Sequence, residues 1–162
     1  YLGAGTSGRL GILDAVECPP TFSVPSSQVV ALIAGGQNAV YKAVEGAEDN
    51  PQLAQQDLQQ VQLSASDVVV GIAASGSTPY VVGALRACRA AGISTGSITC
   101  NPGSPVSEVA DFPVDAFKLA LDCFTLPEQQ KHQQVLQTDN DFPADPQKSH
   151  KLPFDILHAC RR

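Results

Sequence analysis

The stretch DVVVGIAASGSTPYVVGAL at residues 67–85 decides the fold. Val68–Ala73 is a continuous apolar run rich in β-branched residues, which predicts a strand buried on both faces, as in a parallel sheet. After a loop of glycine and hydroxyl residues, Thr78 and Pro79 are typical of an N-cap followed by proline at the first helical position. The apolar pattern then predicts a helix to about Ala91. The stretch therefore predicts one strand-loop-helix unit of an α/β sheet.

The same order of elements recurs on both sides of this unit. Tyr1–Gly3 is predicted to be the end of a strand whose beginning is missing, and a helix over about Ser7–Val16 follows, which Pro19 and Pro20 end. The fold class is therefore α/β: a three-layer, open, mostly parallel sheet with right-handed crossovers, incomplete at its ends. Ligands of such sheets bind at the carboxyl ends of the strands. Further elements are predicted at Val29–Ile33, Asn38–Glu45, Pro51–Val61, Ser94–Thr99 and Pro105–Ala110.

Composition excludes several classes of protein. The chain has 162 residues, a net charge of −6 and a pI of about 4.8, which argue for one domain and against nucleic acid or an anionic membrane as partner. No apolar stretch is long enough to span a bilayer, and no secretory signal is visible. The 5 cysteines are widely spaced, with no C-x-x-C pair. We therefore expect reduced thiols in a cytoplasmic protein, with no disulfide frame and no metal site.

The organisation changes after Val114. Residues 1–114 form the predicted domain, truncated at both ends, and the polar, proline-containing residues 115–162 are predicted to be a divergent, flexible tail.

Two loops combine glycines with hydroxyl residues at the start of a predicted helix. They read GAGTSGR at residues 3–9 and ASGSTPY at residues 74–80. Free amides and the positive dipole end at a helix start favour a phosphate ligand, for which hydroxyls add donors. For each loop the alternative is an ordinary tight turn, with Thr78 acting as a helix cap. The first loop matches G-x-G-x-x-G, but the acidic residue of a dinucleotide site is missing, which favours a phosphorylated small molecule. The candidate ligands are Thr6, Ser7, Gly8, Ser75, Gly76, Ser77 and Thr78.

Several charged residues lie close to these loops in sequence. Arg9 either binds an anionic ligand or pairs with a carboxylate of its own surface. Glu17, in ECPPT, and Glu48, in EGAED, are each most simply solvated carboxylates when taken alone. Two carboxylates beside a phosphate site can instead divide general acid and base catalysis.

These segments together resemble the N-acetylmuramic acid 6-phosphate etherases of the sugar isomerase (SIS) superfamily. The matching text is YLGAGTSGRLGILDAVECPPTF, LIAGG, AVEGAEDNP, DVVVGIAASGSTPYVVGAL and CNPGSPVSEVADF, within residues 1–114. The resemblance implies a flavodoxin-like SIS domain, a cytoplasmic homodimer and a lyase of amino-sugar metabolism and cell wall recycling without a cofactor. Such a lyase cleaves the D-lactyl ether by elimination and hydration, giving N-acetylglucosamine 6-phosphate and D-lactate.

The resemblance also implies roles for individual residues. Glu48 would be the base that removes the C2 proton, and Glu17 the acid that later activates water. The loop residues Ser75, Ser77 and Thr78 would bind the phosphate, with Thr6, Ser7 and Gly8 lining the pocket. The family pattern has arginine where Ser77 stands, and its continuation after Val114 is missing. The alternative is therefore a non-catalytic sugar-phosphate-binding regulator that resembles the glucokinase regulatory protein.

Overall fold

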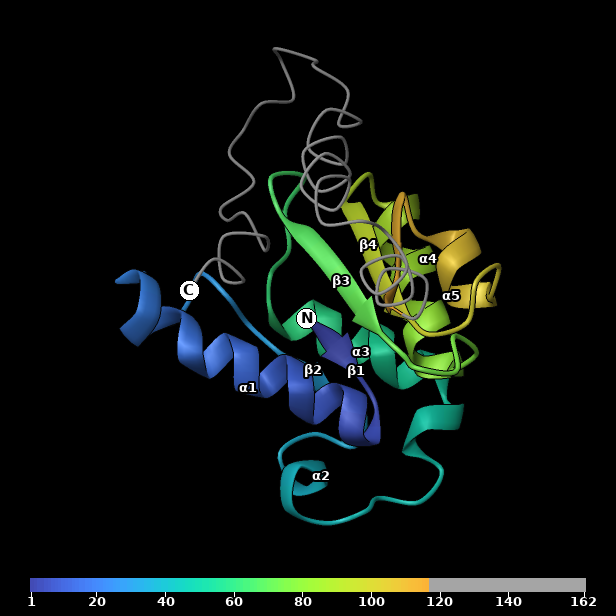
Figure 1. The fold of residues 1–162 in the computed structure, drawn as a ribbon, viewed down its shortest axis with the longest axis horizontal. Helices are drawn as coiled ribbons and strands as arrows, with labels where there is room; N and C mark the ends of the chain where they lie inside the picture. The colour runs from blue at the N-terminus through green and yellow to red at the C-terminus, as the bar shows by residue number, and fades with distance from the viewer. Residues whose placement is uncertain (117–162) are drawn as a thin grey trace, which may run out of the picture. The chain divides into compact units, whose positions relative to one another are not determined.

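A computed structural model describes residues 1–116 and shows one five-stranded, wholly parallel sheet in the order β2-β1-β3-β4-β5 (Figure 1). This confirms the predicted α/β class. The predicted tail lies outside the described residues from residue 117 onward. The strands are β1 Leu2–Gly3, β2 Leu32–Ile33, β3 Val68–Ile72, β4 Ser94–Thr99 and β5 Phe112–Asp115. The helices are α1 Gly5–Phe22, α2 Asn38–Tyr41, the short 3-10 helix η1 Ala47–Asp49, α3 Pro51–Gln60, α4 Pro79–Ala90 and α5 Pro105–Val109.

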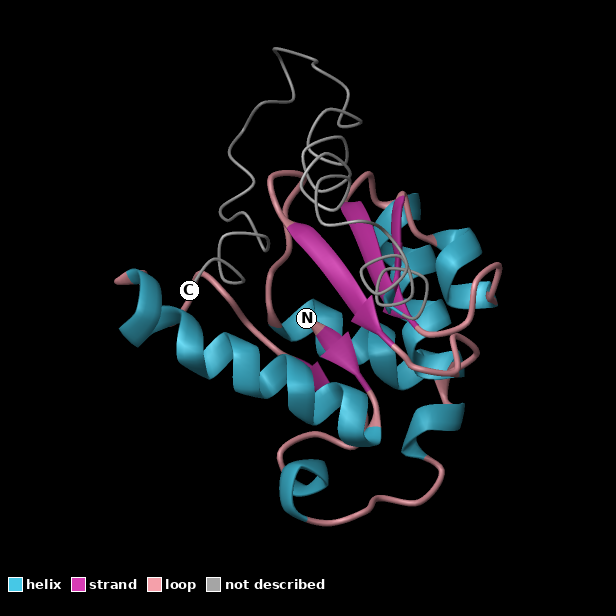
Figure 2. Cartoon of the chain, in the orientation of Figure 1, coloured by secondary structure: helices cyan, strands magenta, loops and turns pink. Residues whose placement is uncertain are grey.

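Helices cover both faces of the sheet (Figure 2). A Cβ built on Gly11 of α1 would lie 3.4 Å from Ile72 Cδ1, whereas one built on Gly71 would lie 2.6 Å from Val81 Cγ1 of α4. Because Gly71 and Ile72 are successive residues of β3, their side chains point to opposite faces. Helices α1 and α4 therefore lie on opposite faces, and the direction of the winding changes between β1 and β3. This is the switch point at which open α/β sheets bind ligands.

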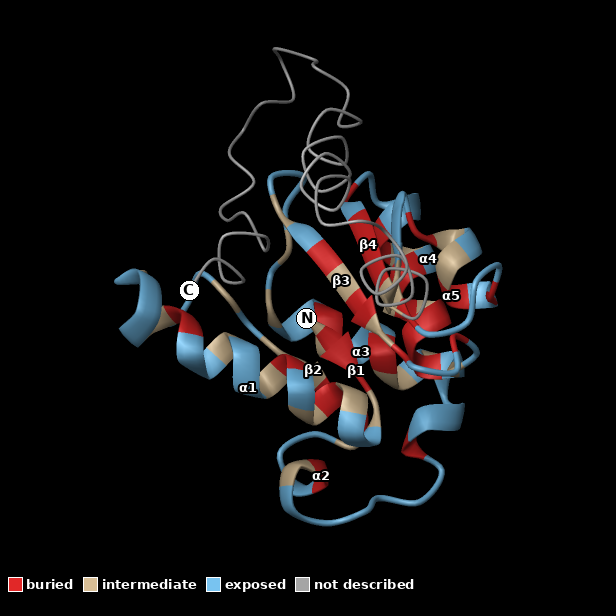
Figure 3. Ribbon diagram, in the orientation of Figure 1, coloured by how far each residue is buried: buried red, intermediate tan, exposed pale blue. Residues whose placement is uncertain are grey.

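The core lies between α3, α4 and one face of β3 and β4 (Figure 3). Tyr80, Val81 and Leu85 of α4 are almost fully buried there. The Tyr80 hydroxyl donates a hydrogen bond of 2.7 Å to Asp57 of α3, which joins the two helices. Burial is the larger cause, and the Asp57 carboxylate the smaller one, of a pKa of Tyr80 well above its usual range. The start of α4 is thus fixed by its packing.

The end of α1 differs from the prediction. Pro19 and Pro20 do not stop the helix, which continues to Phe22 and ends where Ser23 adopts a left-handed conformation and donates its N–H to the Pro19 carbonyl. Each proline removes only its own N–H from the helix, so it deprives the carbonyl four residues earlier of a partner. For Pro20 this carbonyl is that of Val16. Val16 is exposed, so water can donate a hydrogen bond to its carbonyl.

Three other expectations need correction. The exposed fraction of Val68 is 41%, so β3 is not buried on both faces by the described residues; α1 reaches only its Ile72 end. Strand β2 is Leu32–Ile33 instead of Val29–Ile33, because it pairs only with the two residues of β1. Helix α2 ends at Tyr41, since Lys42 is extended. None of the helices within residues 1–116 is long and apolar enough to cross a membrane.

Candidate functional site

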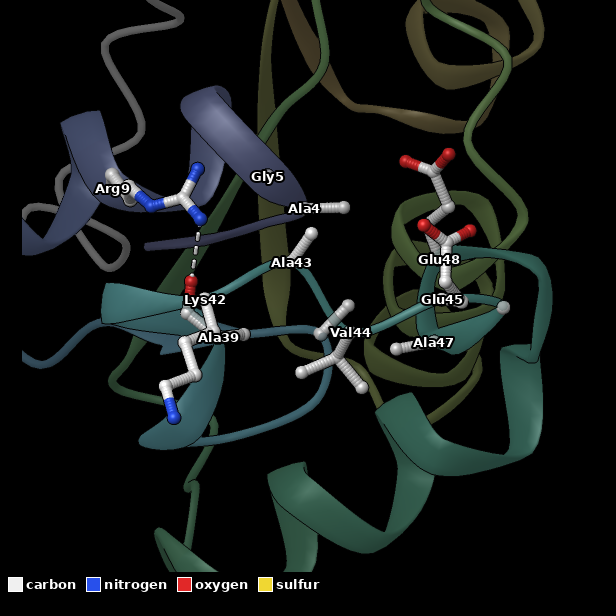
Figure 4. Close-up of a pocket in the computed structure, with 12 residues that line it drawn as sticks. Ala4, Gly5, Arg9, Ala39, Lys42, Ala43, Val44, Glu45, Ala47 and Glu48 are labelled. Carbon is white, nitrogen blue, oxygen red and sulfur yellow. Dashed lines mark hydrogen bonds between the residues drawn. The ribbon is translucent and has the colours of Figure 1, made fainter.

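A cavity of about 210 Å³ opens beside the carboxyl ends of β1 and β2, next to the switch point (Figure 4). Ala4, Gly5 and Arg9 line it from the start of α1. Ala34 and Ala39 line it from the chain after β2, and residues 42–48 close it from the loop that leads to η1. Two stretches that are far apart in sequence, residues 4–9 and 34–48, therefore meet where the fold places a ligand.

The cavity carries charges of both signs. Figure 4 shows the Arg9 guanidinium on one side and the carboxylates of Glu45 and Glu48 on the other, with Ala4 between them. The Lys42 ammonium is directed away from the two glutamates. No ion pair joins these charges; the ion pair recorded within residues 1–116 is that of Arg89 with Asp111, at 3.1 Å. A polar ligand can therefore meet a cation and a carboxylate in one cavity.

In the first predicted phosphate loop, two of the glycines serve helix packing. A Cβ on Gly8 would lie 2.6 Å from Ile33 Cγ1 and 2.9 Å from the Gly3 carbonyl oxygen, so only a glycine lets α1 approach β1 this closely. Gly8 is buried, Ser7 is partly buried and Thr6 is exposed. Helix α1 has no side-chain cap and no acidic residue in its first turn. Its first amides and its positive dipole end are therefore available to an anion beside the cavity.

The second loop is held in shape by the chain that follows β4. Asn101 Nδ2 donates to the Ser75 carbonyl at 3.2 Å, and the Val106 N–H donates to the Gly76 carbonyl at 2.8 Å. Ser75 and Ser77 are exposed, and their hydroxyls are 3.2 Å apart. Two hydroxyls and the start of α4 thus face solvent at the carboxyl end of β3, next to β1.

Thr78 stands at the N-cap of α4, as predicted, but its side chain makes no capping hydrogen bond. The reading of its hydroxyl as a helix cap is therefore wrong, and the hydroxyl remains a candidate ligand. The sequence does not predict the roles of Asn101 and Ser104, which support the loop. Asn101-Pro102-Gly103 indicates only a turn, and nothing in it signals a contact across 26 residues with Ser75.

The structure separates the two carboxylates that were paired by resemblance. Glu48 lies on η1 and lines the cavity beside the first loop. Glu17 is exposed on α1, 12 residues after Gly5, which is about 18 Å along a helix. It does not line this cavity, and neither do the second-loop residues 75–78. The catalytic and phosphate-binding roles of all these residues remain predictions.

No group of three or more His, Cys, Asp or Glu side chains within residues 1–116 is arranged to hold a metal ion. Cys18 and Cys88 are buried free thiols, and burial raises the pKa of each. Neither thiol lines the cavity.

The chain is similar in sequence to several known proteins. The chain is 62% identical over 114 residues to an N-acetylmuramic acid 6-phosphate etherase of Cronobacter sakazakii, which covers 70% of this chain and 38% of that protein. It is 64% identical over 111 residues to the protein of the same name from Edwardsiella ictaluri, covering 68% and 37%. A solved structure from Salmonella typhimurium, provisionally described as a phosphosugar isomerase, aligns with a TM-score of 0.46 at 18% identity and covers 70% of this chain and 28% of that one. The chain spans less than two-fifths of the length of these curated relatives. The model of the glucokinase regulatory protein N-terminal SIS domain matches residues 1–89, more than half of the chain, and the chain belongs to this SIS domain family.

Proposed function

We propose that this chain acts on N-acetylmuramic acid 6-phosphate, and that its cavity at the switch point between β1 and β3 supplies part of an etherase active site. The observation that carries the proposal is the position of Glu48, in a cavity at the switch point beside the start of α1. The names of the relatives at 62% and 64% identity support the same substrate. The exposed hydroxyls at the start of α4 would hold the 6-phosphate, because they lie next to free helix amides. We also propose a cytoplasmic location, in keeping with the free thiols of the described residues.

The chemistry follows from a carboxylate next to an open-chain amino sugar. The C1 aldehyde acidifies the C2 proton, which the Glu48 carboxylate accepts. The electron pair of the C2–H bond forms a C2=C3 double bond, and the C3–O bond breaks, so that the lactate oxygen leaves and takes up a proton. Water then adds its hydroxyl to C3 and a proton to C2. The products are N-acetylglucosamine 6-phosphate and D-lactate.

In this proposal Glu17 donates the proton to the leaving oxygen and later activates the water. Since Glu17 lies about 12 Å along α1 from Arg9, the nearest residue of that helix in the cavity of its own chain, it would act in the cavity of a second copy. A mixture of Glu17→Gln and Glu48→Gln chains would then recover part of the activity that each lacks alone. Failure of the mixture to regain lactate release, when each variant still folds, would remove Glu17 from this role.

The test of the proposal is exchange of the C2 proton in deuterium oxide, followed by NMR, together with an assay for D-lactate. We expect Glu48→Gln to abolish both signals. The matched control is Glu45→Gln, which removes a neighbouring carboxylate of the same cavity and should leave exchange within a few-fold of the parent chain. Unchanged exchange in Glu48→Gln would show that another group is the base.

The second candidate function is a sugar-phosphate-binding regulator without catalysis. Two observations favour it: Glu17 is remote from the cavity, and the matching family model is that of a regulatory protein domain. Calorimetry separates the two functions, because a regulator binds N-acetylglucosamine 6-phosphate saturably while neither lactate nor C2 exchange is detected.

A further inference from the structure

Arg9 is the one charged side chain in the cavity that protein contacts hold in a fixed orientation within residues 1–116. Its Nε donates to the Val40 carbonyl at 2.9 Å and its Nη2 donates to the Ala39 carbonyl at 2.8 Å. Both contacts reach 30 residues or more along the chain and involve the last turn of α2. The remaining donors of the guanidinium, including both on Nη1, are not used by these bonds.

The charge of Arg9 is oriented but not neutralised. Carbonyl oxygens accept its hydrogen bonds without supplying a negative charge, and no carboxylate within residues 1–116 forms an ion pair with it. The side chain is partly buried, and a cation removed from water gains from an opposite charge. A planar guanidinium with free donors matches a carboxylate particularly well. The cavity therefore presents a fixed site for an anionic group of its ligand.

The proposed substrate has two anionic groups, and their positions distinguish them. The 6-phosphate is assigned above to residues 75–78, which do not line the cavity. The second anion is the carboxylate of the lactyl group, four bonds from C2 through the C3 ether. It must lie in the same cavity as the base that removes the C2 proton, and Arg9 lies across that cavity from Glu48 (Figure 4).

We propose that Arg9 binds the lactyl carboxylate and thereby selects the lactyl ether over the sugar phosphate that lacks it. This assignment rests on the proposed function. Lys42 is the other cation of the cavity, but its ammonium is directed away from the glutamates, and no protein contact fixes it within the described residues.

The experiment measures the dissociation constants of two ligands by calorimetry. They are N-acetylmuramic acid 6-phosphate and N-acetylglucosamine 6-phosphate, which differ by the lactyl group. All measurements use the full 162-residue chain carrying Glu48→Gln, so that neither ligand is converted. We expect Arg9→Gln to weaken binding of the lactyl ligand on the order of 10- to 100-fold, the range of a charge-assisted hydrogen bond, and binding of the other ligand less than 3-fold, roughly.

Two variants serve as controls. Arg9→Lys keeps the charge but cannot donate the two parallel hydrogen bonds that a guanidinium gives a carboxylate, and it should retain part of the preference for the lactyl ligand. Arg86→Gln removes an exposed arginine of α4 outside the cavity and should leave both dissociation constants unchanged. Circular dichroism of each variant shows whether it remains folded.

The outcomes separate this proposal from the proposed function. If the parent binds both ligands equally, or if Arg9→Gln weakens both equally while remaining folded, the carboxylate assignment is overturned and the sugar-phosphate site stands. If the parent binds neither ligand, the proposed function falls together with the assignment. Selective loss of the lactyl ligand in Arg9→Gln, with Arg86→Gln unaffected, supports the assignment.

Discussion

Substitution of Gly76 by alanine tests whether the chain after β4 determines the shape of the second loop, residues 74–80. Gly76 has a φ of 70°, in the left-handed region. A Cβ built on it would overlap Oγ and Cβ of Ser104, the buried N-cap residue of α5. An alanine at this position therefore meets two separate penalties, one from the backbone and one from overpacking.

The chain contains a matched control for the first penalty. Gly92 has a φ of 75°, and nothing lies within 4 Å of its Cβ position. Gly92→Ala should lower the free energy of unfolding by about 1–2 kcal/mol, the cost of the left-handed conformation alone. Gly76→Ala adds overpacking worth about 1–3 kcal/mol, for a total of about 2–5 kcal/mol. Such a loss is a large part of the 5–15 kcal/mol, roughly, that stabilises a typical domain.

Urea unfolding followed by far-ultraviolet circular dichroism measures both penalties. In a Ser104→Gly background the overlap is removed, so Gly76→Ala should cost about as much as Gly92→Ala, with a coupling energy of about 1–3 kcal/mol. The affinity for inorganic phosphate should also fall in Gly76→Ala but not in Gly92→Ala. Ser104 does not impose the shape of the loop if Gly76→Ala costs no more than Gly92→Ala, or if its extra cost persists without the Ser104 side chain.

Three further predictions concern the core and the second loop. Burial, and after it Asp57, raise the pKa of Tyr80, so the unfolded chain releases this proton first, and the free energy of unfolding falls as the pH rises above 10.0, the ordinary pKa of tyrosine. Tyr80→Phe should flatten this decline in urea midpoints, and an unchanged slope would contradict the raised pKa. The Ser97 hydroxyl is buried without a partner among the described residues, so Ser97→Ala should leave the midpoint unchanged or raise it, whereas Thr95→Val, which removes a 2.8 Å bond to an aspartate, should cost about 1–3 kcal/mol. Ser77→Arg should strengthen inorganic phosphate binding by about 10-fold through a charge-assisted contact; equal strengthening by Ser94→Arg, at the amino end of β4, would show a general charge effect instead.

Local sequence chemistry predicts the central unit of the fold well. The β-branched run from Val68 and the pair Thr78-Pro79 place the start of β3 and the start of α4 correctly, because both depend on residues close in sequence. The end of α1 could not be found in this way, since the tolerance of Pro19 and Pro20 depends on whether the carbonyls they deprive can reach water.

Those parts of the candidate site that depend on residue type and on residues close in sequence could also be predicted. The loop residues and Glu48 stand out by residue type, and the structure places Glu48 in a cavity beside the first loop. Glu17 lies 12 residues beyond Gly5 along α1, away from the cavity that Glu48 lines, and its motif alone does not indicate this distance. The contacts of Arg9 with α2 and of Asn101 with the Ser75 loop join distant segments, and no local pattern indicates them.

The anchoring of the two loops by different parts of the chain has an evolutionary consequence. Asn101 and the chain after it hold the loop at β3, whereas Arg9 and α2 frame the cavity that contains Glu48. A lineage can therefore exchange the acid at position 48 without disturbing the other anchor. Under the proposed function, replacement of Glu48 alone would remove the base while both anchors remain, so an enzyme and a binding protein on this scaffold would differ by few substitutions.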